Sequence, residues 1–205
     1  MKSLILRKKD RKLRRKTDYS VYTVPMKTNT YEYTWENYCQ MQLNDISIFA
    51  LNFIPTIPKN EEPLEILEDI FSDLSHKINN NNYDIRVNNE FVYFQIAAYT
   101  MAMIDQFKLK AGIGDVYELL VRKQKDYGPL NITEFGSIGI VIRMFDKVAR
   151  LRNLLTKNQN IQTANEVPNE TFLDTLMDII GYCTIGLMLE DFDSEYGCKF
   201  LVPMN

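Results

Sequence analysis

The sequence predicts an all-α fold, a helical bundle of four to five helices that follows an extended basic N-terminal arm. Two observations lead to this prediction. Apolar residues recur at helical spacing in separate stretches between residues 63 and 191. Clusters of glycine, proline and asparagine lie between these stretches, where one helix must end and the next begin. A hydrophobic content of 45% in 205 residues is enough for the core of one domain of ordinary size.

The charge of the chain is strongly asymmetric. The formal net charge is −3, but residues 1–16 contain nine basic side chains and one acidic one, Asp10. The rest of the chain therefore carries fifteen basic and twenty-six acidic residues. We predict a flexible arm over residues 1–30, whose segment 2–16 contacts nucleic-acid phosphates or an acidic protein surface. The alternative is a disordered tail that aids solubility or docks on its own acidic body.

Residues 31–110 form an aromatic-rich N-terminal part. Tyrosines alternate with polar residues at its beginning, which fits a short strand, while residues 35–53 fit a helix equally well. Its aromatic residues could stack nucleobases, but packing against the body is the favoured interpretation. Pro63 begins an amphipathic helix predicted over 63–79. A helix at 90–109 follows and is apolar on most sides, so we expect it to be the most buried element.

Residues 111–191 are predicted to contain three more helices, at about 115–125, 137–155 and 170–190. The turn at residues 126–129 separates the first two, because proline lacks a backbone donor and glycine tolerates unusual dihedral angles. A polar loop over 156–169 separates the last two. Residues 192–205 form a tail that we do not expect to be helical.

Cysteine and histidine usage excludes several kinds of site. The three cysteines have no metal-like spacing, and the one histidine, His76, cannot build a catalytic triad alone. The apolar run at residues 4–6 is too short for a signal peptide. No uncharged apolar stretch reaches the roughly 18 residues that a membrane span requires. We therefore predict a protein without a membrane partner.

Two of the predicted helices carry polar residues along one face. Helix 137–155 has charged residues at relative positions 0, 3, 4 and 7, namely Arg143, Asp146, Lys147 and Arg150. Helix 170–190 has polar residues four positions apart, namely Glu170, Asp174, Asp178 and Tyr182. Because burying a lone carboxylate is prohibitive, the acidic face must meet water or cations. We therefore expect a polar seam shared by the two helices.

The order of motifs along the chain resembles that of a known family. Residues 125–128 read K-D-Y-G and residues 135–136 read F-G. Residues 143–154 follow R-x-x-D-K-x-x-R-L-x-N-L, and residues 170–182 follow E-x-x-x-D-T-L-x-D-x-x-x-Y. This pattern, over roughly residues 112–190, resembles the nucleotide-modification-associated domain found in many bacteriophage proteins. That family is similar to the all-α NTP pyrophosphatases of the MazG-like and dimeric dUTPase-like types.

The resemblance implies a helical fold, a role in phage nucleotide metabolism or modified DNA bases, and a homo-oligomer. It places the protein in the cytoplasm of a phage-infected bacterial cell or in the virion. The pyrophosphatases carry Glu-x-x-Glu on one helix and Glu-x-x-Asp on the next, which hold magnesium. This chain has Asp115-x-x-Glu118 and Asp174-x-x-x-Asp178 instead, so the spacing differs and the gap between the pairs is long.

The polar seam contains the residue types that a nucleotide site requires, carboxylates for a metal ion and cations for phosphate groups. Magnesium prefers oxygen ligands, and the predicted metal ligands are Glu118, Asp146, Asp174 and Asp178. The predicted catalytic residues are Glu170, Asp174 and Asp178, with a metal-activated water that attacks the α-phosphorus and releases pyrophosphate. The predicted substrate-binding residues are Arg143, Lys147 and Arg150 from the helix and Lys125, Tyr127 and Asn131 from around the turn.

Three functions stay open at this point. The first is a phage-type nucleotide-binding protein, either a Mg-dependent (d)NTP pyrophosphohydrolase or an accessory to base modification. The second is a non-enzymatic virion or nucleic-acid-associated protein in which the helical domain is structural and the arm binds. The third is a host-interaction protein that sequesters a nucleotide. A structural interpretation of the seam instead pairs Asp174 and Asp178 with Arg143, Lys147 and Arg150 in an ion network that fixes helix register.

Overall fold

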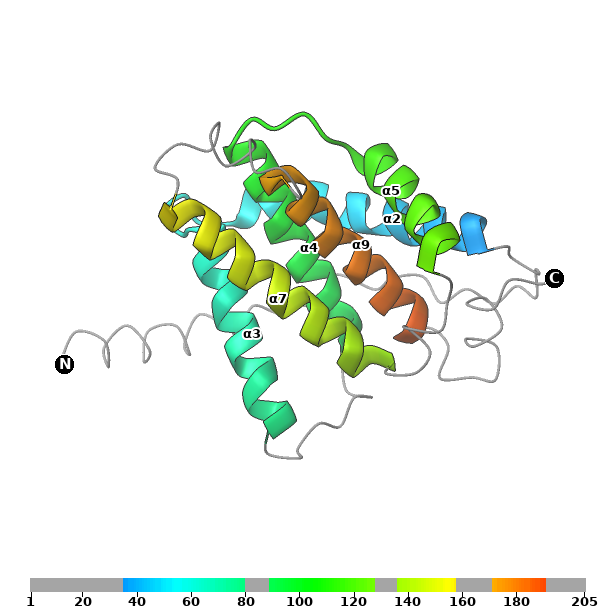
Figure 1. Ribbon diagram of the computed structural model, residues 1–205. Helices are drawn as coiled ribbons and strands as arrows, with labels where there is room; N and C mark the ends of the chain where they lie inside the picture. The colour runs from blue at the N-terminus through cyan, green and yellow to red at the C-terminus, as the bar shows by residue number, and fades with distance from the viewer. Residues whose placement is uncertain (1–34, 80–88, 128–135, 158–170, 191–205) are drawn as a thin grey trace. The chain divides into compact units, whose positions relative to one another are not determined.

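The computed structural model describes residues 35–79, 89–127, 136–157 and 171–190. Within these ranges it contains six α-helices and no strand, so the all-α prediction is confirmed (Figure 1). The helices are α2 (Trp35–Phe53), α3 (Pro63–Asn79), α4 (Asn89–Gln106), α5 (Ile113–Tyr127), α7 (Gly136–Lys157) and α9 (Phe172–Glu190). A short 3-10 helix, η2 (Ile54–Thr56), follows α2.

The aromatic-rich segment is a helix where the structure describes it. The buried side chains of α2 recur at helical spacing, and they are Tyr38, Cys39, Gln42, Leu43, Ile46, Phe49 and Ala50. The ring of Phe49 lies 5.2 Å from that of Phe53 and 5.2 Å from that of Phe94 on α4. These aromatic residues pack within the body, and α2 adds a sixth helix to the five predicted after residue 63.

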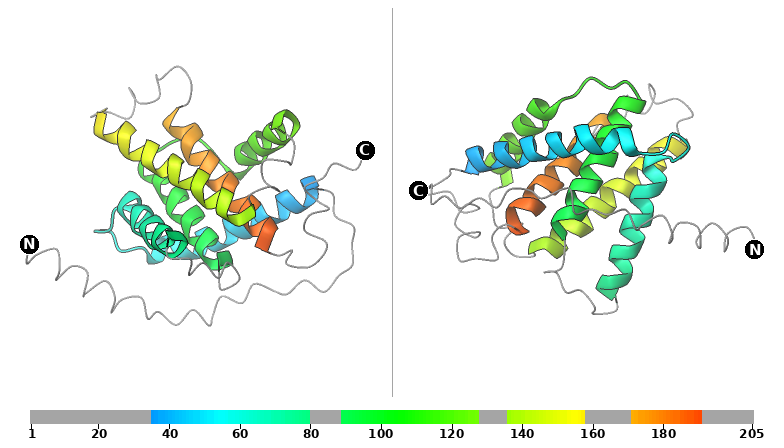
Figure 2. Two further views of the ribbon diagram at one scale, coloured as in Figure 1. Left: turned by 60° about the horizontal axis from the view of Figure 1, so that its bottom comes forward. Right: turned by 180° about the vertical axis from the view of Figure 1, so that it is seen from behind.

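The central helix of the bundle is α9. It packs against α2, α4, α5 and α7, and lies between α5 and α7 in the views of Figures 1 and 2. Its buried apolar side chains point to several sides, and they are Phe172, Leu176, Ile179, Ile180, Cys183, Ile185, Leu187 and Met188. A Cβ atom at Gly186 would come within 2.6 Å of the Tyr93 ring, so the close contact between α9 and α4 requires glycine there.

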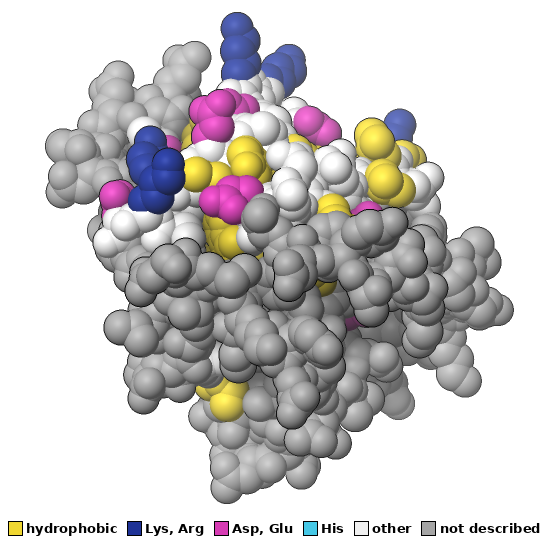
Figure 3. Space-filling model, turned by 90° about the vertical axis from the view of Figure 1, so that its right-hand side faces the viewer, with side chains coloured by type: hydrophobic (Ala, Val, Ile, Leu, Met, Phe, Trp, Pro, Cys, Tyr) yellow, Lys and Arg dark blue, Asp and Glu magenta, His cyan; other side chains and the backbone are white. Residues whose placement is uncertain are grey.

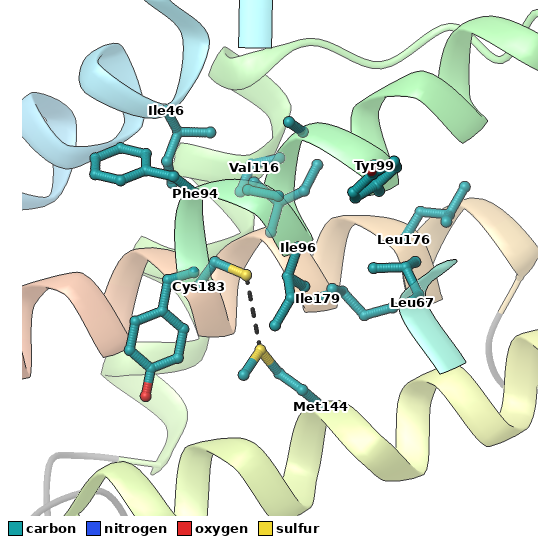
Figure 4. Packing of buried hydrophobic residues seen from close by; sticks show 14 of the residues in the cluster. Ile46, Leu67, Phe94, Ile96, Tyr99, Val116, Met144, Leu176, Ile179 and Cys183 are labelled. Atoms are coloured by element: carbon teal, nitrogen blue, oxygen red, sulfur yellow. Dashed lines mark hydrogen bonds between the residues drawn. The ribbon is translucent and has the colours of Figure 1, made fainter. Parts of the chain in front are cut away.

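One hydrophobic core joins all six helices (Figure 4). It contains residues from both predicted parts, 31–110 and 111–191. In its centre the thiol of Cys183 donates a weak hydrogen bond to the Met144 sulfur, 3.7 Å away. Burial raises the pKa of the Cys39 thiol to about 12 and also raises the pKa of Cys183. Both cysteines are free, and they act as packing residues.

Two helix boundaries differ from the prediction for identifiable reasons. We expected α4 to reach residue 109, but it ends at Gln106 because Lys108 adopts a positive φ of 53°. The amides of Lys108 and Leu109 donate to the carbonyls of Asp105 and Ile104, which is the Schellman pattern of a helix end. We expected the last helix to begin at residue 170, but it begins at Phe172 because Thr171 caps it.

By length and composition, α9 is also apolar enough to cross a membrane, over the window Phe172–Leu189. In the bundle, 72% of that window is buried against the rest of the chain. The same apolar character is what a central core helix requires.

Several predictions concern residues that lie outside the described ones. They are the arm at 1–30, the turn residue Asn131, the carboxylate of Glu170 and the tail at 192–205.

Candidate functional site

Asp178 on α9 holds two lysines from two different helices. The ammonium group of Lys123 on α5 donates to its Oδ1 atom. The ammonium group of Lys147 on α7 lies 2.9 Å from its Oδ2 atom. The carboxylate is buried, with only 5% of its side chain exposed, whereas the lysine side chains are 36% and 20% exposed. We call these three residues the lysine–aspartate triad.

The electrostatics of the triad favour the charged carboxylate. Burial by itself would raise the pKa of Asp178, because it disfavours a charged group. The hydrogen bonds and positive charges of Lys123 and Lys147 outweigh burial and lower the pKa below its usual value. Within these three residues two ammonium groups face one carboxylate, and Lys147 also has an interaction outside the triad.

The surrounding helices fix the three side chains in place. On α5, Lys123 follows the buried residues Val116, Leu119 and Leu120 at helical spacing, so it extends the apolar face that packs on α9. On α7, Lys147 lies beside the face that buries Met144 and Leu151. Both lysines therefore point from the edge of a buried surface toward α9. Their aliphatic stems can lie along that surface while the ammonium groups reach the carboxylate.

Asp174, one turn before Asp178, has a different partner. Its Oδ2 atom accepts hydrogen bonds from the backbone amide of Thr171 at 3.0 Å and from the Thr171 hydroxyl at 2.7 Å. The Thr171 hydroxyl oxygen in turn accepts from the amide of Asp174 at 3.0 Å. This reciprocal arrangement is a capping box, which satisfies backbone donors that the first turn of a helix leaves open. Asp174 thus closes the beginning of α9.

Asp115 plays a similar part at the beginning of α5. Its Oδ2 atom accepts a hydrogen bond from the backbone amide of Gly112 at 2.7 Å. Asp115 and Asp174 are the first acids of the two carboxylate pairs that the sequence pattern singled out. Both lie in the first turn of their helix, where negative charge is favoured by the helix dipole.

The remaining predicted site residues are spread along α5 and α7. Arg143 and Arg150 are half-buried on α7, on the same helix face as Lys147. Asp146 and Glu118 are exposed. Lys125 is exposed and stands two positions from Lys123, which places it on another side of α5. Position 127 ends α5, and Asn131 and Glu170 lie outside the described residues.

The predicted magnesium ligands Glu118, Asp146, Asp174 and Asp178 all lie in described helices. Among the described residues, no three His, Cys, Asp or Glu side chains come together as a metal-binding group. In this arrangement Asp178 already holds two ammonium groups and Asp174 caps its helix. The four carboxylates therefore do not form one ligand set here, and the magnesium site stays a prediction.

The structural interpretation of the seam predicted one of the two contacts of Asp178. The pair with Lys147 is present, whereas the contact with Lys123 is not among the predicted ones. The sequence contains a feature that indicates Lys123, because this lysine occupies a position that continues the apolar face of α5. Likewise, the spacing Thr171-x-x-Asp174 before an apolar run matches a helix-capping pattern.

The surface around α5 carries both signs of charge. On the side of the molecule shown in Figure 3, the described surface has Lys and Arg side chains close to Asp and Glu side chains, with apolar patches between them. In the part of this face that is described, side chains of both signs therefore lie close together.

The comparisons with known proteins yield no relative for this chain. No family model matches it, and no curated protein and no solved structure matches it. The class that fold and site define is an all-α bundle with a buried carboxylate between two lysines. The resemblance to bacteriophage nucleotide-modification-associated domains stays a prediction. The geometry of the triad is the feature of the described structure that bears on function.

Proposed function

We propose that the chain binds the phosphate groups of a nucleotide at the lysine–aspartate triad. The observation that carries the proposal is that one buried carboxylate holds two ammonium groups, of which that of Lys123 is partly exposed. A charge that is partly withdrawn from water attracts an anion more strongly than the same charge on an open surface. Lysine is a common ligand of phosphate, which it binds as a compact point charge.

Lys123 is the residue best placed to meet the ligand. Its side chain is 36% exposed, so the ammonium group can be reached from solvent while Asp178 holds its position. An ammonium group has three hydrogen-bond donors, and one contact with Asp178 leaves capacity for a phosphate oxygen. Lys147 contributes charge from the other side of the carboxylate, and Arg150 is the next cation along that face of α7. The sequence pattern adds Lys125, Tyr127 and Asn131 as further candidates.

The proposed activity of the triad is binding, and hydrolysis of the bound nucleotide would be a further activity. Asp174 and Asp178, the described residues predicted to be catalytic, both have hydrogen-bond partners within the chain. To hold a metal or activate a water, each would first have to exchange these partners. The mechanism proposed for the triad therefore includes no bond-breaking step.

The test is a panel of canonical and modified NTPs and dNTPs, with and without Mg²⁺ or Mn²⁺. Thermal shift and pyrophosphate release are read for wild type, Asp174→Ala and Asp178→Ala. We expect at least one nucleotide to raise the melting temperature of wild type and of Asp174→Ala, and to lose most of that effect in Asp178→Ala, because the lysines lose their common anchor. The proposal is wrong if no nucleotide shifts wild type. Metal-dependent release that both substitutions abolish would extend it to hydrolysis.

A second candidate function uses the basic arm. The observation that favours it is the run of nine basic side chains against one acidic one in residues 1–16. Such a segment binds nucleic acid through its phosphates, with an affinity that falls steeply as salt rises. We expect a variant that lacks residues 2–16 to lose salt-dependent nucleic-acid binding and to keep nucleotide binding. If full-length protein does not bind nucleic acid at low salt, this second function is excluded.

A further inference from the structure

The outward face of α7 carries large apolar side chains that the described part of the chain leaves exposed. Ile142 is 52% exposed and Phe145 is 48% exposed. They are one turn apart, and the exposed Ala149 follows one turn after Phe145. We call these three residues the α7 stripe. A single exposed apolar residue is ordinary, but a row along one helix indicates a surface that is covered by a partner.

The stripe runs between two anchored edges of α7. On one edge, Lys147 pairs with Asp178 of α9. On the other edge, Arg152 forms a two-point hydrogen bond with Glu68 of α3, in which its Nε atom lies 2.7 Å from Oε1. The Phe145 ring also leans on Phe71 of α3, with 6.3 Å between ring centres. The stripe is therefore held rigidly on the outside of the bundle, where α7 lies in Figures 1 and 2.

Charges beside the stripe indicate which partner fits it. Arg143 and Asp146 lie along one edge of the stripe, the edge next to Ile142. They are one helical turn apart and opposite in sign. Neither makes an ion pair with any part of the chain that the structure describes. A surface with an apolar row and one charge of each sign is complementary to itself, because a two-fold axis brings each charge opposite the other.

We propose that two copies of this chain associate through antiparallel contact of their α7 helices. A two-fold axis beside Phe145 places the two Phe145 rings next to each other. The same axis brings Ile142 close to Ala149 of the second copy and Arg143 close to Asp146 of the second copy. The centres of the three pairings all lie within half a residue of Phe145, so a single register brings the apolar and the charged contacts close together. This assigns Arg143 a different partner from the phosphate that the sequence pattern predicts for it.

The other exposed apolar pair of the described surface lacks these features. Ile48 and Leu51 on α2 are 59% and 73% exposed. The only charged residue between positions 44 and 55 is Asp45, so α2 itself offers no pair of opposite charges beside these two residues. Leu51 therefore supplies a matched control, an apolar residue even more exposed than those of the stripe but outside the proposed contact.

The test is the mass of the protein in solution, measured by sedimentation over a wide concentration series at low salt. We expect wild type to approach twice the chain mass of 24.1 kDa as concentration rises. Phe145→Asp should sediment as a monomer over the whole series, while Leu51→Asp should behave as wild type. Circular dichroism shows whether each variant keeps its helices.

Charge reversal tests the register itself. Arg143→Asp places two acids opposite each other across the axis, and Asp146→Arg places two cations there, so each should weaken association by about tenfold or more. The double variant Arg143→Asp/Asp146→Arg restores opposite charges and should recover most of the wild-type dimer. A monomeric wild type would overturn the proposal. A dimer that Phe145→Asp leaves intact, or a double variant weaker than both single variants, would also overturn it.

Discussion

The first and second turns of α9 carry the same residue type on the same helix face, but the two aspartates have different roles. Asp174 accepts hydrogen bonds from Thr171, three residues earlier, and closes the helix end. Asp178 binds Lys123 and Lys147, which are 55 and 31 positions away in sequence and come from two other helices. Acidic residues spaced along one helix face therefore do not define a site. What separates a capping residue from a binding residue is the partner.

The difference also appears in exposure. Asp174 is half-buried at a helix end, where water and backbone donors are close. Asp178 lies among buried residues and is charged only because two cations accompany it. Local sequence can satisfy the first aspartate, whereas the second depends on the assembled bundle. Substitutions at the two positions should therefore differ in how much unfolding free energy they cost and in which part of the fold they disturb.

The largest effect is expected at Asp178. In Asp178→Asn the side chain keeps its shape but loses its charge, and two half-buried ammonium groups lose their counterion. Breaking a fully buried pair costs about 3–5 kcal/mol, and the partial exposure of the lysines reduces this to about 2–4 kcal/mol of unfolding free energy. Urea denaturation measures it. A loss no larger than that of Asp174→Ala would show that Asp178 is not a structural anchor.

Next in size is the removal of one lysine. Lys147→Met should cost about 1–2 kcal/mol, because Asp178 keeps Lys123 as a partner and methionine retains most of the buried stem. Lys123→Met should cost less, since Lys123 is the more exposed of the two. The same denaturation series ranks the two variants. The opposite order would mean that Lys123 is the principal partner of the carboxylate.

At the first turn, Asp174→Ala should lower the free energy of unfolding by about 1 kcal/mol, the usual cost of a lost helix cap. Asp174→Glu is the matched control, because a glutamate can complete the same capping box with Thr171. Hydrogen exchange at the beginning of α9 should accelerate in Asp174→Ala and stay slow in Asp174→Glu. If both variants fray equally, the capping box does not hold this helix end.

The smallest expected effect is the dependence on pH. The folded pKa of Asp178 lies below the usual 3.8, so its charge stabilises the fold fully above that usual value. The stabilisation is lost as pH falls through the lower, folded pKa. The stability difference between wild type and Asp178→Asn should therefore be constant from about pH 8 to about pH 5 and shrink below about pH 4. A difference that grows on acidification would contradict the lowered pKa.

The sequence predicted the helices well because their patterns are local. Pro63, the apolar spacing of α7 and the breaks near residues 80 and 128 are readable without the fold. The interpretation of residues 31–53 stayed ambiguous because the tyrosines at its beginning alternate with polar residues, which fits a strand, while residues 35–53 also fit a helix. The end of α4 was misplaced because Lys108, a residue with no special turn signal, takes the left-handed conformation that glycine usually supplies.

The candidate site was predicted only in part, for a physical reason. Helical spacing places Asp178 and Lys147 on the faces of their own helices, but it does not state which helices meet. Lys123 joins them because α5 and α7 both pack on α9, an arrangement that comes from tertiary packing. The magnesium ligand set likewise assumed that carboxylates from three helices converge, and spacing along each helix carries no information on that.

We propose that the lysine–aspartate triad binds phosphate through Lys123. The most direct measurement is calorimetric titration of the best nucleotide from the panel into wild type, Lys123→Gln and Arg122→Gln. Arg122 is the matched control, because it is exposed on the same helix, one position away, and its substitution removes the same charge. We predict that Lys123→Gln weakens binding about tenfold, as the loss of a charge-assisted hydrogen bond does, and that Arg122→Gln changes it little. Equal affinity of the two variants would show that Lys123 does not contact the phosphate.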